Sequence, residues 1–401
     1  MKLTWGERLW PARTAGLDGP GAPERDARCD VLIVGAGISG AMTADALVRA
    51  GLDVIAIDKR TPGCGSSGAS TALLLYELDT PLRELIPLVG EDHSARAYQL
   101  GINAIDEIEK LVSELGDDCS FQRKKSVYLA SSPKDAAHLQ DECELRRKQG
   151  FRVELLHESD IAGRFGFRRP AAILSHEAAE VDPFRLNQLL IRRALTNGLR
   201  LFTHTELARY EPTSDGAFAR LTNGCAIRAK RLVYATGYEA APLIGSEFAR
   251  AQVSYAVASE PLDSFETWWE RCLLWETARP YLYLRTTSDG RALIGGEDDP
   301  DLRHLGDNER LEKKGEHLRS EFSKLFPRID FRPAFAWAGV FETTPDGLPY
   351  IGAHPRFPRA LFGLGYGGNG MTFSMIAAQI LRDLVTGRKN EDAEIFGFDR
   401  R

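Results

Sequence analysis

The chain has 401 residues, of which 43% are hydrophobic and 27% are charged, and this composition excludes a fibrous or largely disordered protein. Its length is enough for two or three packed lobes, and its net charge of −6 at pH 7 disfavours nucleic acid and anionic membranes as partners. No apolar run approaches the ~20 residues that span a bilayer, and residues 1–19 lack the apolar core of a signal peptide, so we expect a soluble, cytoplasmic protein with no membrane partner.

The first predicted elements form a strand–helix–strand unit. Residues 1–28 are rich in Gly, Pro and charge, so we expect an irregular lead-in there. Residues 31–34 (VLIV) predict a strand that is buried on both faces, and they are followed by glycines and by a helical pattern that ends at Gly51. Residues 53–57 predict a second buried strand, which completes a βαβ unit of about the expected ~30 residues.

The rest of the chain alternates between helical and strand patterns. Helical patterns cover residues 84–115, 133–149, 184–196 and 371–386, a third buried strand is predicted at 232–235, and residues 61–72 predict a loop. Residues 281–285 and 291–295 flank Ser288-Asp289-Gly290, which predicts an antiparallel hairpin. The six cysteines form no CxxC pair, so reduced thiols are expected.

A GxGxxG motif at residues 35–40 (GAGISG) joins the first strand to the first helix. Gly35 permits the tight turn, Gly37 lets the backbone approach a pyrophosphate, and Gly40 lets helix and strand pack closely. The amides and the positive end of the helix dipole hold the phosphates. Asp58, at the end of the second strand, can accept hydrogen bonds from a ribose. The motif therefore predicts a dinucleotide site, without distinguishing NAD from FAD.

Further segments recur in a fixed order along nearly the whole chain. They are residues 30–37 (DVLIVGAG), 65–72 (GSSGASTA), 180–183 (EVDP), 234–237 (YATG), 344–352 (TPDGLPYIG) and 365–372 (GYGGNGMT). In this order they resemble the D-amino-acid oxidase-type FAD-dependent oxidoreductases, a family that includes glycine oxidase, sarcosine oxidase, D-amino-acid dehydrogenases and gamma-glutamylputrescine oxidase.

The resemblance implies bound FAD. The residues expected to contact it are Gly35, Gly37, Ile38, Ser39, Gly40, Asp58, Lys59, Arg60, Ser66, Ser67, Ala69, Ser70, Thr71, Leu207, Ala235, Thr236, Gly237, Gly339, Gly367, Gly368, Asn369, Gly370, Met371 and Thr372. The cysteine that binds flavin covalently in sarcosine oxidase-like members corresponds to Gly339, and the 65–72 loop has no histidine, so non-covalent FAD is expected.

The substrate side departs from the family pattern. Amino-acid members hold the substrate carboxylate with an arginine that corresponds to Phe341, and a second arginine in some members corresponds to Gly368. The usual carboxylate clamp is thus missing, which weakens the case for an ordinary amino acid. Arg285 is expected either to hold a carboxylate or to be ion-paired or at the surface. Glu342 is expected either to favour a cationic amine or to be a solvated loop acid.

Most of the residues expected to line the substrate cavity come directly after the loop 65–72, which is expected to contact the flavin and is called the flavin loop below. The expected lining of the cavity is Leu74, Leu75, Tyr76, Glu77 and Phe341, closed by Tyr255, Tyr283 and Tyr366, although each aromatic is also compatible with plain packing. The candidate catalytic residues are Tyr283, Arg285 and Glu342. The resemblance implies hydride transfer from a neutral amine to flavin N5, giving an imine that hydrolyses, without a dedicated acid or base. Oxygen or another electron acceptor is left open, as is the oligomeric state.

No metal site is expected. Residues 176–180 (HEAAE) half-resemble a zinc HExxH helix, but Glu180 stands where the second histidine would be. Neither GxxxxGK[ST] nor GxSxG occurs, so a phosphate-binding loop and a serine hydrolase have no support.

We therefore expect an α/β fold in which a Rossmann-like FAD-binding domain, from residues 28–85, 150–245 and 332–401, is interleaved with a substrate domain. The substrate domain, from 86–149 and 246–331, is expected to be an antiparallel sheet with helices (an α+β part). The preferred function is oxidation of an amine or amino-acid C–N bond. Two alternatives remain: the flavin-binding subunit of a heteromeric dehydrogenase, and an NAD-dependent dehydrogenase, which would leave the C-terminal glycine loop without a cofactor edge.

Overall fold

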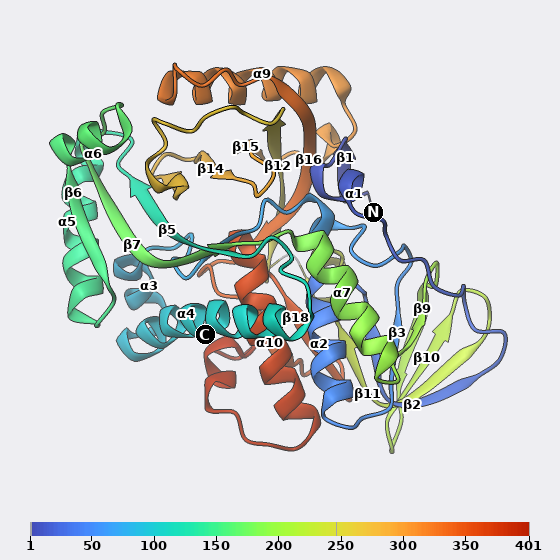
Figure 1. Ribbon diagram of the computed structural model, residues 1–401. Coiled ribbons are helices and arrows are strands. Elements are labelled where there is room, and N and C mark those ends of the chain that lie inside the picture. Colours follow the sequence, from blue (N-terminus) through green and yellow to red (C-terminus); the bar gives the residue numbers. More distant parts are fainter. Residues whose placement is uncertain (1, 246, 401) are drawn as a thin grey trace.

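Two β-sheets of different character form the framework of the molecule (Figure 1). The computed structural model describes residues 2–245 and 247–400. One sheet is mostly parallel and carries the GxGxxG turn, whereas the other is mostly antiparallel and lies beside it. The mixed α/β fold predicted from the sequence is confirmed.

The first sheet is built around the buried apolar strands seen in the sequence. Its eight strands are β2 (Ala27–Val34), β3 (Val54–Ile57), β8 (Arg200–Phe202), β9 (Leu207–Pro212), β10 (Ala217–Leu221), β11 (Ala226–Tyr234), β17 (Tyr350–Ala353) and β18 (Ala360–Leu364). Strands β18, β11, β2, β3 and β8 pair in parallel in this order. Val31, Leu32 and Ile33 of β2 are fully buried because helices or further strands cover both faces of a parallel sheet.

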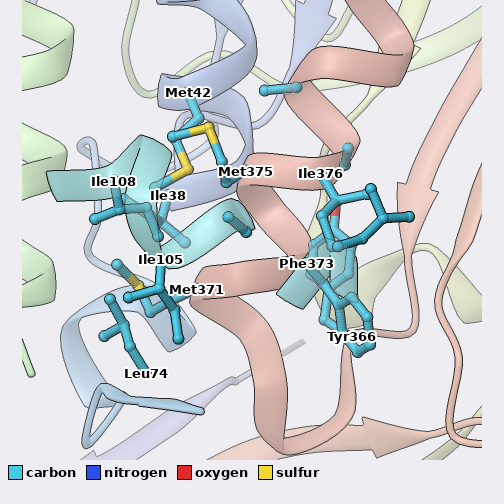
Figure 2. Packing of buried hydrophobic residues seen from close by; sticks show 14 of the residues in the cluster. Ile38, Met42, Leu74, Ile105, Ile108, Tyr366, Met371, Phe373, Met375 and Ile376 are labelled. Atoms are coloured by element: carbon cyan, nitrogen blue, oxygen red, sulfur yellow. The ribbon is translucent and has the colours of Figure 1, made fainter. Parts of the chain in front are cut away.

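Helices cover this sheet and enclose the largest apolar core. They are α2 (Ile38–Arg49), α4 (Glu91–Glu114), α7 (Pro183–Thr196) and α10 (Gly370–Val385). Helix α10 packs against α2 and α4, and α2 packs against α7. Figure 2 shows side chains of these helices meeting, among them Met42, Ile105 and Met375. Asp182 caps α7 by accepting from the backbone N–H groups of Phe184 and Arg185 at 3.0 and 2.9 Å.

The second sheet contains the predicted hairpin. Its ten strands are β1 (Thr4–Gly6), β4 (Leu73–Leu75), β5 (Gln122–Leu129), β6 (Val153–His157), β7 (Ala171–Glu180), β12 (Arg250–Ser259), β13 (Leu273–Glu276), β14 (Tyr283–Thr286), β15 (Ala292–Asp299) and β16 (Pro333–Thr343). Strands β14 and β15 pair antiparallel around a turn in which Gly290 has a φ of 80°, as the Asp-Gly pair predicted.

Four longer helical elements flank the second sheet or its edge. They are α3 (Leu82–Val89), α5 (Pro133–Lys148), α6 (Glu158–Phe165) and α9 (Asn308–Leu325). Helix α9 lies across β12, β15 and β16 at the top of Figure 1. The single helix expected over 84–115 is divided at Gly90, whose φ of 88° is disfavoured for other residues.

The strands are distributed between the two sheets differently from the expected domain boundaries. Strands β6, β7 and β16 belong to the antiparallel sheet, although residues 150–245 and 332–401 were assigned to the FAD-binding part. A strand's sheet depends on its distant partners, which local hydrophobic patterns do not reveal. The expected irregular lead-in is also partly wrong, because β1 pairs with β16 and α1 (Leu9–Arg13) buries Leu9 and Trp10. Among the described residues, no helix is long and apolar enough to cross a bilayer.

Candidate active site

A cavity of about 530 Å³ opens at the carboxyl ends of β2 and β3. The GxGxxG turn, the end of β3, the loop after β8 and the start of α10 line it. Its volume falls within the roughly 300–1,000 Å³ of small-molecule and cofactor pockets. The site therefore lies where ligands bind in open α/β sheets.

The glycine turn is required by close backbone contacts. Gly35 has a φ of 107°, and a Cβ atom there would lie 2.4 Å from the carbonyl oxygen of Ala235. A Cβ atom on Gly40 would lie 1.9 Å from the carbonyl oxygen of Gly35. Any larger residue at either position would separate α2 from the strands, and the amino end of α2 would leave the cavity wall.

Asp58 closes the nucleotide end of the cavity. Its carboxylate accepts hydrogen bonds from the backbone N–H of Ala36 at 2.7 Å and of Arg60 at 2.8 Å. Burial raises the pKa of Asp58, and these two hydrogen bonds oppose that rise. The carboxylate thus ties the glycine turn to the end of β3 while remaining part of the cavity wall.

Most residues assigned to FAD by the sequence line this first cavity. They are Gly35, Gly37, Ile38, Ser39, Asp58, Lys59, Arg60, Ser66, Ser67, Ser70, Leu207, Ala235, Thr236, Gly237, Gly370 and Met371. Gly40 lies behind the turn, and Thr372 is buried with its hydroxyl donating to the carbonyl oxygen of Asn369 at 3.1 Å. Neither of these two residues lines a cavity, so their part is to shape its wall.

The remaining candidates line a second, smaller cavity of about 140 Å³, which adjoins the first. They are Ala69, Thr71, Gly339, Gly367, Gly368 and Asn369. Ser66, Ser70, Tyr238 and Gly370 line both cavities, so the two lie side by side. The residues present fit a dinucleotide whose one end lies against the glycine turn and whose other end reaches the second cavity. A buried hydroxyl of Thr236 without a hydrogen-bond partner faces this path.

The register of β4 decides which side chains enter the second cavity. Leu73, Leu75 and Glu77 line it, whereas Leu74 and Tyr76 point into the apolar core. Figure 2 shows Leu74 in that core together with Met371 and Ile105. Alternate residues of a strand face opposite sides, so the expected placement of Leu74 and Tyr76 in the substrate cavity was wrong by one position.

Arg285 is buried in the framework and does not line the cavity. Its Nη1 donates to the carbonyl oxygens of Thr71, Ala72 and Val181 at 2.9 to 3.0 Å, and its Nε lies 3.4 Å from Glu180. The guanidinium is 1% exposed. Arg285 therefore fixes the flavin loop to β7, and this placement contradicts its candidate role in holding a substrate carboxylate.

Glu342 is fully buried, and both of its carboxylate oxygens lack a hydrogen-bond partner. It is not one of the residues that line either cavity, whereas its neighbour Phe341 lines the second one. Burial raises the pKa of Glu342 to about 8. The alternative of a solvated loop acid is therefore wrong, and the Glu342 side chain lies behind the cavity wall that Phe341 forms.

The three tyrosines expected to close the substrate cavity lie in three different places. Tyr283 lines the second cavity, and its hydroxyl lies 3.2 Å from that of Ser254. Tyr366 lines the first cavity, where its hydroxyl lies 2.7 Å from that of Ser39. Tyr255 belongs to the apolar core beneath α9, with Lys314 over its ring at 5.7 Å. Tyr366 thus faces the cofactor cavity, and Tyr255 faces no cavity of the site.

The sequence reasoning missed several cavity residues. They are Asp79, Tyr238, Ser254, Ala256, Trp275, Tyr281, Asp298 and Trp337. They come from several distant segments, and none stands in a motif that identifies it. Asp79, four residues after Leu75, and Asp298, three residues after the predicted hairpin strand 291–295, could have been found only by their closeness to recognised segments.

Comparison with protein families shows to which family a chain with this arrangement of sheets and cavities belongs. Residues 30–384 match the family model described as FAD dependent oxidoreductase (DAO). The chain belongs to this family. It is 25% identical over 382 residues to gamma-glutamylputrescine oxidoreductase of Escherichia coli (strain K12), which covers 92% of this chain and 85% of the relative.

Two glycine oxidases give the same picture for this FAD-dependent oxidoreductase. The enzyme of Bacillus subtilis (strain 168) is 23% identical over 380 residues, covering 93% of this chain and 97% of that protein. The crystal structure of glycine oxidase from Geobacillus kaustophilus aligns with a TM-score of 0.79 and 23% identity, covering 94% of this chain and 99% of that chain. The protein is thus an FAD-dependent oxidoreductase, and the alternative of an NAD-dependent dehydrogenase is removed.

Proposed function

We propose that this protein oxidises a C–N bond of an amine or amino acid. When bound, FAD would accept a hydride at N5 from the carbon next to the nitrogen, and the resulting imine would hydrolyse. The observation that carries the proposal is that the two cavities adjoin and share four lining residues. A cofactor that begins at the glycine turn can end beside the second cavity, where a small molecule has room.

The side chains around the second cavity support orientation rather than acid–base catalysis. Burial raises the pKa of Tyr283, so its phenol stays protonated and acts as a hydrogen-bonding group. Phe341 and Trp337 add apolar walls that exclude water from the reacting carbon. The names of the relatives, glycine oxidase and gamma-glutamylputrescine oxidoreductase, support a nitrogen compound as the substrate.

The test is anaerobic absorbance of the purified holoenzyme during addition of amines and amino acids. Loss of the flavin band with one class of compound, and formation of the carbonyl product in stoichiometric amount, is the expected result. An intact flavin band with every amine and amino acid, in protein that holds a full complement of FAD, would contradict the proposal and favour a flavin-binding subunit. Admission of air afterwards measures whether oxygen reoxidises the flavin.

A further inference from the structure

The second cavity is acidic. Glu77, Asp79 and Asp298 line it, and no lysine, arginine or histidine is found among its lining residues in the described part of the chain. A substrate carboxylate would meet three carboxylates there, whereas an ammonium group would find opposite charge. The cavity is also rich in aromatic rings, because Trp275, Tyr281 and Tyr283 belong to its wall. Aromatic faces attract cations, with the strongest effect where water is excluded.

Asp79 lies beside Gly368, the position that corresponds to an arginine in some members of the family. The backbone N–H of Gly368 donates to Asp79 Oδ2 at 3.1 Å, and the Tyr281 hydroxyl donates to Asp79 Oδ1 at 2.8 Å. A Cβ atom on Gly368 would lie 3.0 Å from Asp79 Oδ2 and 3.1 Å from the Tyr281 hydroxyl. The carboxylate and the phenol thus occupy the space that a side chain at position 368 would need. Glycine at 368 and aspartate at 79 together replace a positive charge by a negative one.

Asp298 enters the cavity from a bulge. Across β12 and β15, Val253 pairs with Asp299 but Tyr255 pairs with Gly296, so β15 has one extra residue there. Asp298 Oδ1 is buried and has no hydrogen-bond partner. Burial, aided by the charge of Asp79, raises the pKa of Asp298 to about 6, and a hydrogen bond from Ser254 and the charges of Lys314 and Arg279 oppose this rise.

Glu77 supplies a second unsatisfied acceptor at the cavity wall. It is 1% exposed, and its Oε2 has no hydrogen-bond partner. Its Oε1 accepts from the Ser126 hydroxyl at 2.5 Å and lies 3.9 Å from Arg146 Nη1. Arg146 also pairs with Glu142 at 2.7 Å, so one guanidinium is shared by two buried carboxyl groups. A buried acceptor of this kind is costly unless a ligand or water satisfies it.

The nearest surface cation does not alter this picture. Arg279 donates to the backbone carbonyl oxygen of Asp79 at 3.1 Å, and its guanidinium lies 5.0 Å from the centre of the Tyr281 ring. It stands at the rim and does not line the cavity. The carboxylates of Asp79 and Asp298 therefore face the cavity with no cationic side chain between them among the described lining residues.

We propose that the substrate is a diamine-type cation, in which one nitrogen reacts at the flavin and a second, positively charged nitrogen is held by Asp79 and Asp298 against Tyr281 and Tyr283. This inference rests on the proposed oxidation of a C–N bond and names its substrate class. It assigns Asp79 and Asp298 as specificity residues for a positive charge.

The test uses three probes of equal chain length: 1,4-diaminobutane, n-butylamine and 4-aminobutanoate. They differ only in carrying a cation, a methyl group or a carboxylate at the far end. Binding to the oxidised holoenzyme is measured from the perturbation of the flavin spectrum without oxygen, and reduction from the subsequent loss of absorbance. We expect 1,4-diaminobutane to bind about tenfold or more tightly than n-butylamine, and 4-aminobutanoate to bind most weakly.

Variants then assign the effect to residues. Asp79→Asn and Asp298→Asn are each expected to weaken binding of 1,4-diaminobutane by about tenfold and to change binding of n-butylamine by less than about threefold. Asp330→Asn is the matched control, because Asp330 is an exposed aspartate that pairs with Arg332 at 3.1 Å. Flavin content per chain checks that each variant folds.

The outcomes separate this inference from the proposed function. Equal binding of the three probes, or preference for 4-aminobutanoate, overturns the inference whether or not the flavin is reduced. Preferential binding of 1,4-diaminobutane that depends on the two aspartates supports the inference. If the flavin then stays oxidised with all amines, the proposed oxidation is contradicted while the charge selectivity stands.

Discussion

The protonation state of Glu342 is set by its buried surroundings, although its side chain does not line either cavity. Its carboxylate is buried without a hydrogen-bond partner, next to Phe341, which does line the substrate cavity. Its charge contributes, after burial, to the raised pKa of Tyr238. A carboxyl group in this setting is neutral over most of the physiological pH range.

The pH dependence of stability tests this placement. The pKa of Glu342 is about 8 in the folded protein and 4.5 in its ordinary, unfolded setting. Between pH 4.5 and pH 8, Glu342 is therefore protonated in the folded protein but ionised in the unfolded chain. The free energy of unfolding therefore falls as pH rises from about 4.5 to about 8. Between pH 6 and pH 8.5, the melting temperature of Glu342→Gln is expected to fall by roughly 2–5 °C less than the melting temperature of the unsubstituted protein. Thermal melts at both pH values measure this.

Glu266→Gln is the control for that experiment, because Glu266 is exposed and its neutralisation removes a similar charge from the surface. Equal pH dependence in Glu342→Gln and in the unsubstituted protein would show that Glu342 is ionised and solvated in the folded state.

At the scale of elements, β4 divides its residues between the core and the cavity. Leu74 is fully buried in the apolar core, whereas Leu75 is half-buried and lines the substrate cavity. The sequence predicted that this segment follows the flavin loop, but the side that each residue faces depends on pairing with β7.

Alanine substitution of the two leucines separates the faces. Leu74→Ala is expected to lower the free energy of unfolding by about 2–5 kcal/mol, because it opens a cavity in the core. Leu75→Ala is expected to affect stability less and to raise the KM of the amine substrate more. Thermal melts and steady-state kinetics of both variants measure the two effects, and a larger KM change in Leu74→Ala would show that the register is different.

The amino-terminal segment is a second case in which an element acquires its role only by packing. Trp10 Nε1 donates to the carbonyl oxygen of Ser70 at 2.7 Å, and Trp337 Nε1 donates to that of Ala69 at 2.8 Å. Two indole rings from α1 and β16 thus hold the loop that lines both cavities. Composition alone predicted only an irregular lead-in.

Loss of the Trp10 hydrogen bond is expected to loosen this loop. Trp10→Phe keeps most of the apolar contact but removes the donor, so FAD should bind about 3- to 10-fold more weakly. Trp5→Phe is the matched control, because Trp5 Nε1 donates to the exposed Asn308 side chain at 2.8 Å, away from the cavities. Fluorescence of FAD released on dilution measures the dissociation constants. Equal affinities of the two variants would contradict a role of Trp10 in cofactor binding.

At the scale of the whole molecule, the two sheets meet around the cofactor path. The first cavity lies on the parallel sheet, the second is walled by strands of the antiparallel sheet, and four residues belong to both. A cofactor that lies through both cavities contacts both parts of the fold. Its binding therefore stabilises the molecule as a whole rather than one sheet.

Removal of FAD is expected to lower the melting temperature of the entire transition. With free FAD at about 100 times its dissociation constant, binding contributes about 2.7 kcal/mol to the folded state. Calorimetric scans of the apoprotein and the holoprotein, with circular dichroism as a second probe, measure the shift. An unshifted transition for part of the structure would show that one sheet unfolds independently of the cofactor.

The sequence by itself determined the family, the cofactor and the local geometry of the glycine turn. The family and the cofactor follow from short segments that recur in order along the chain. The tight turn follows from the strand, glycines and helix over 27–49, although the close contact of Gly35 with Ala235 depends on the packing of β11 beside β2. The sequence also indicated, through Phe341 and Gly368, that the carboxylate clamp of related enzymes is absent.

Only the tertiary structure decided which side chains line the second cavity. Asp79 and Asp298 lie 219 positions apart in numbering and belong to segments that local patterns cannot bring together. Arg285 and Glu342 are chemically suitable for substrate binding, but their burial and contacts place them in the framework. Long-range strand pairing and the β-bulge before Asp298 set these positions, and neither follows from residue type or spacing alone.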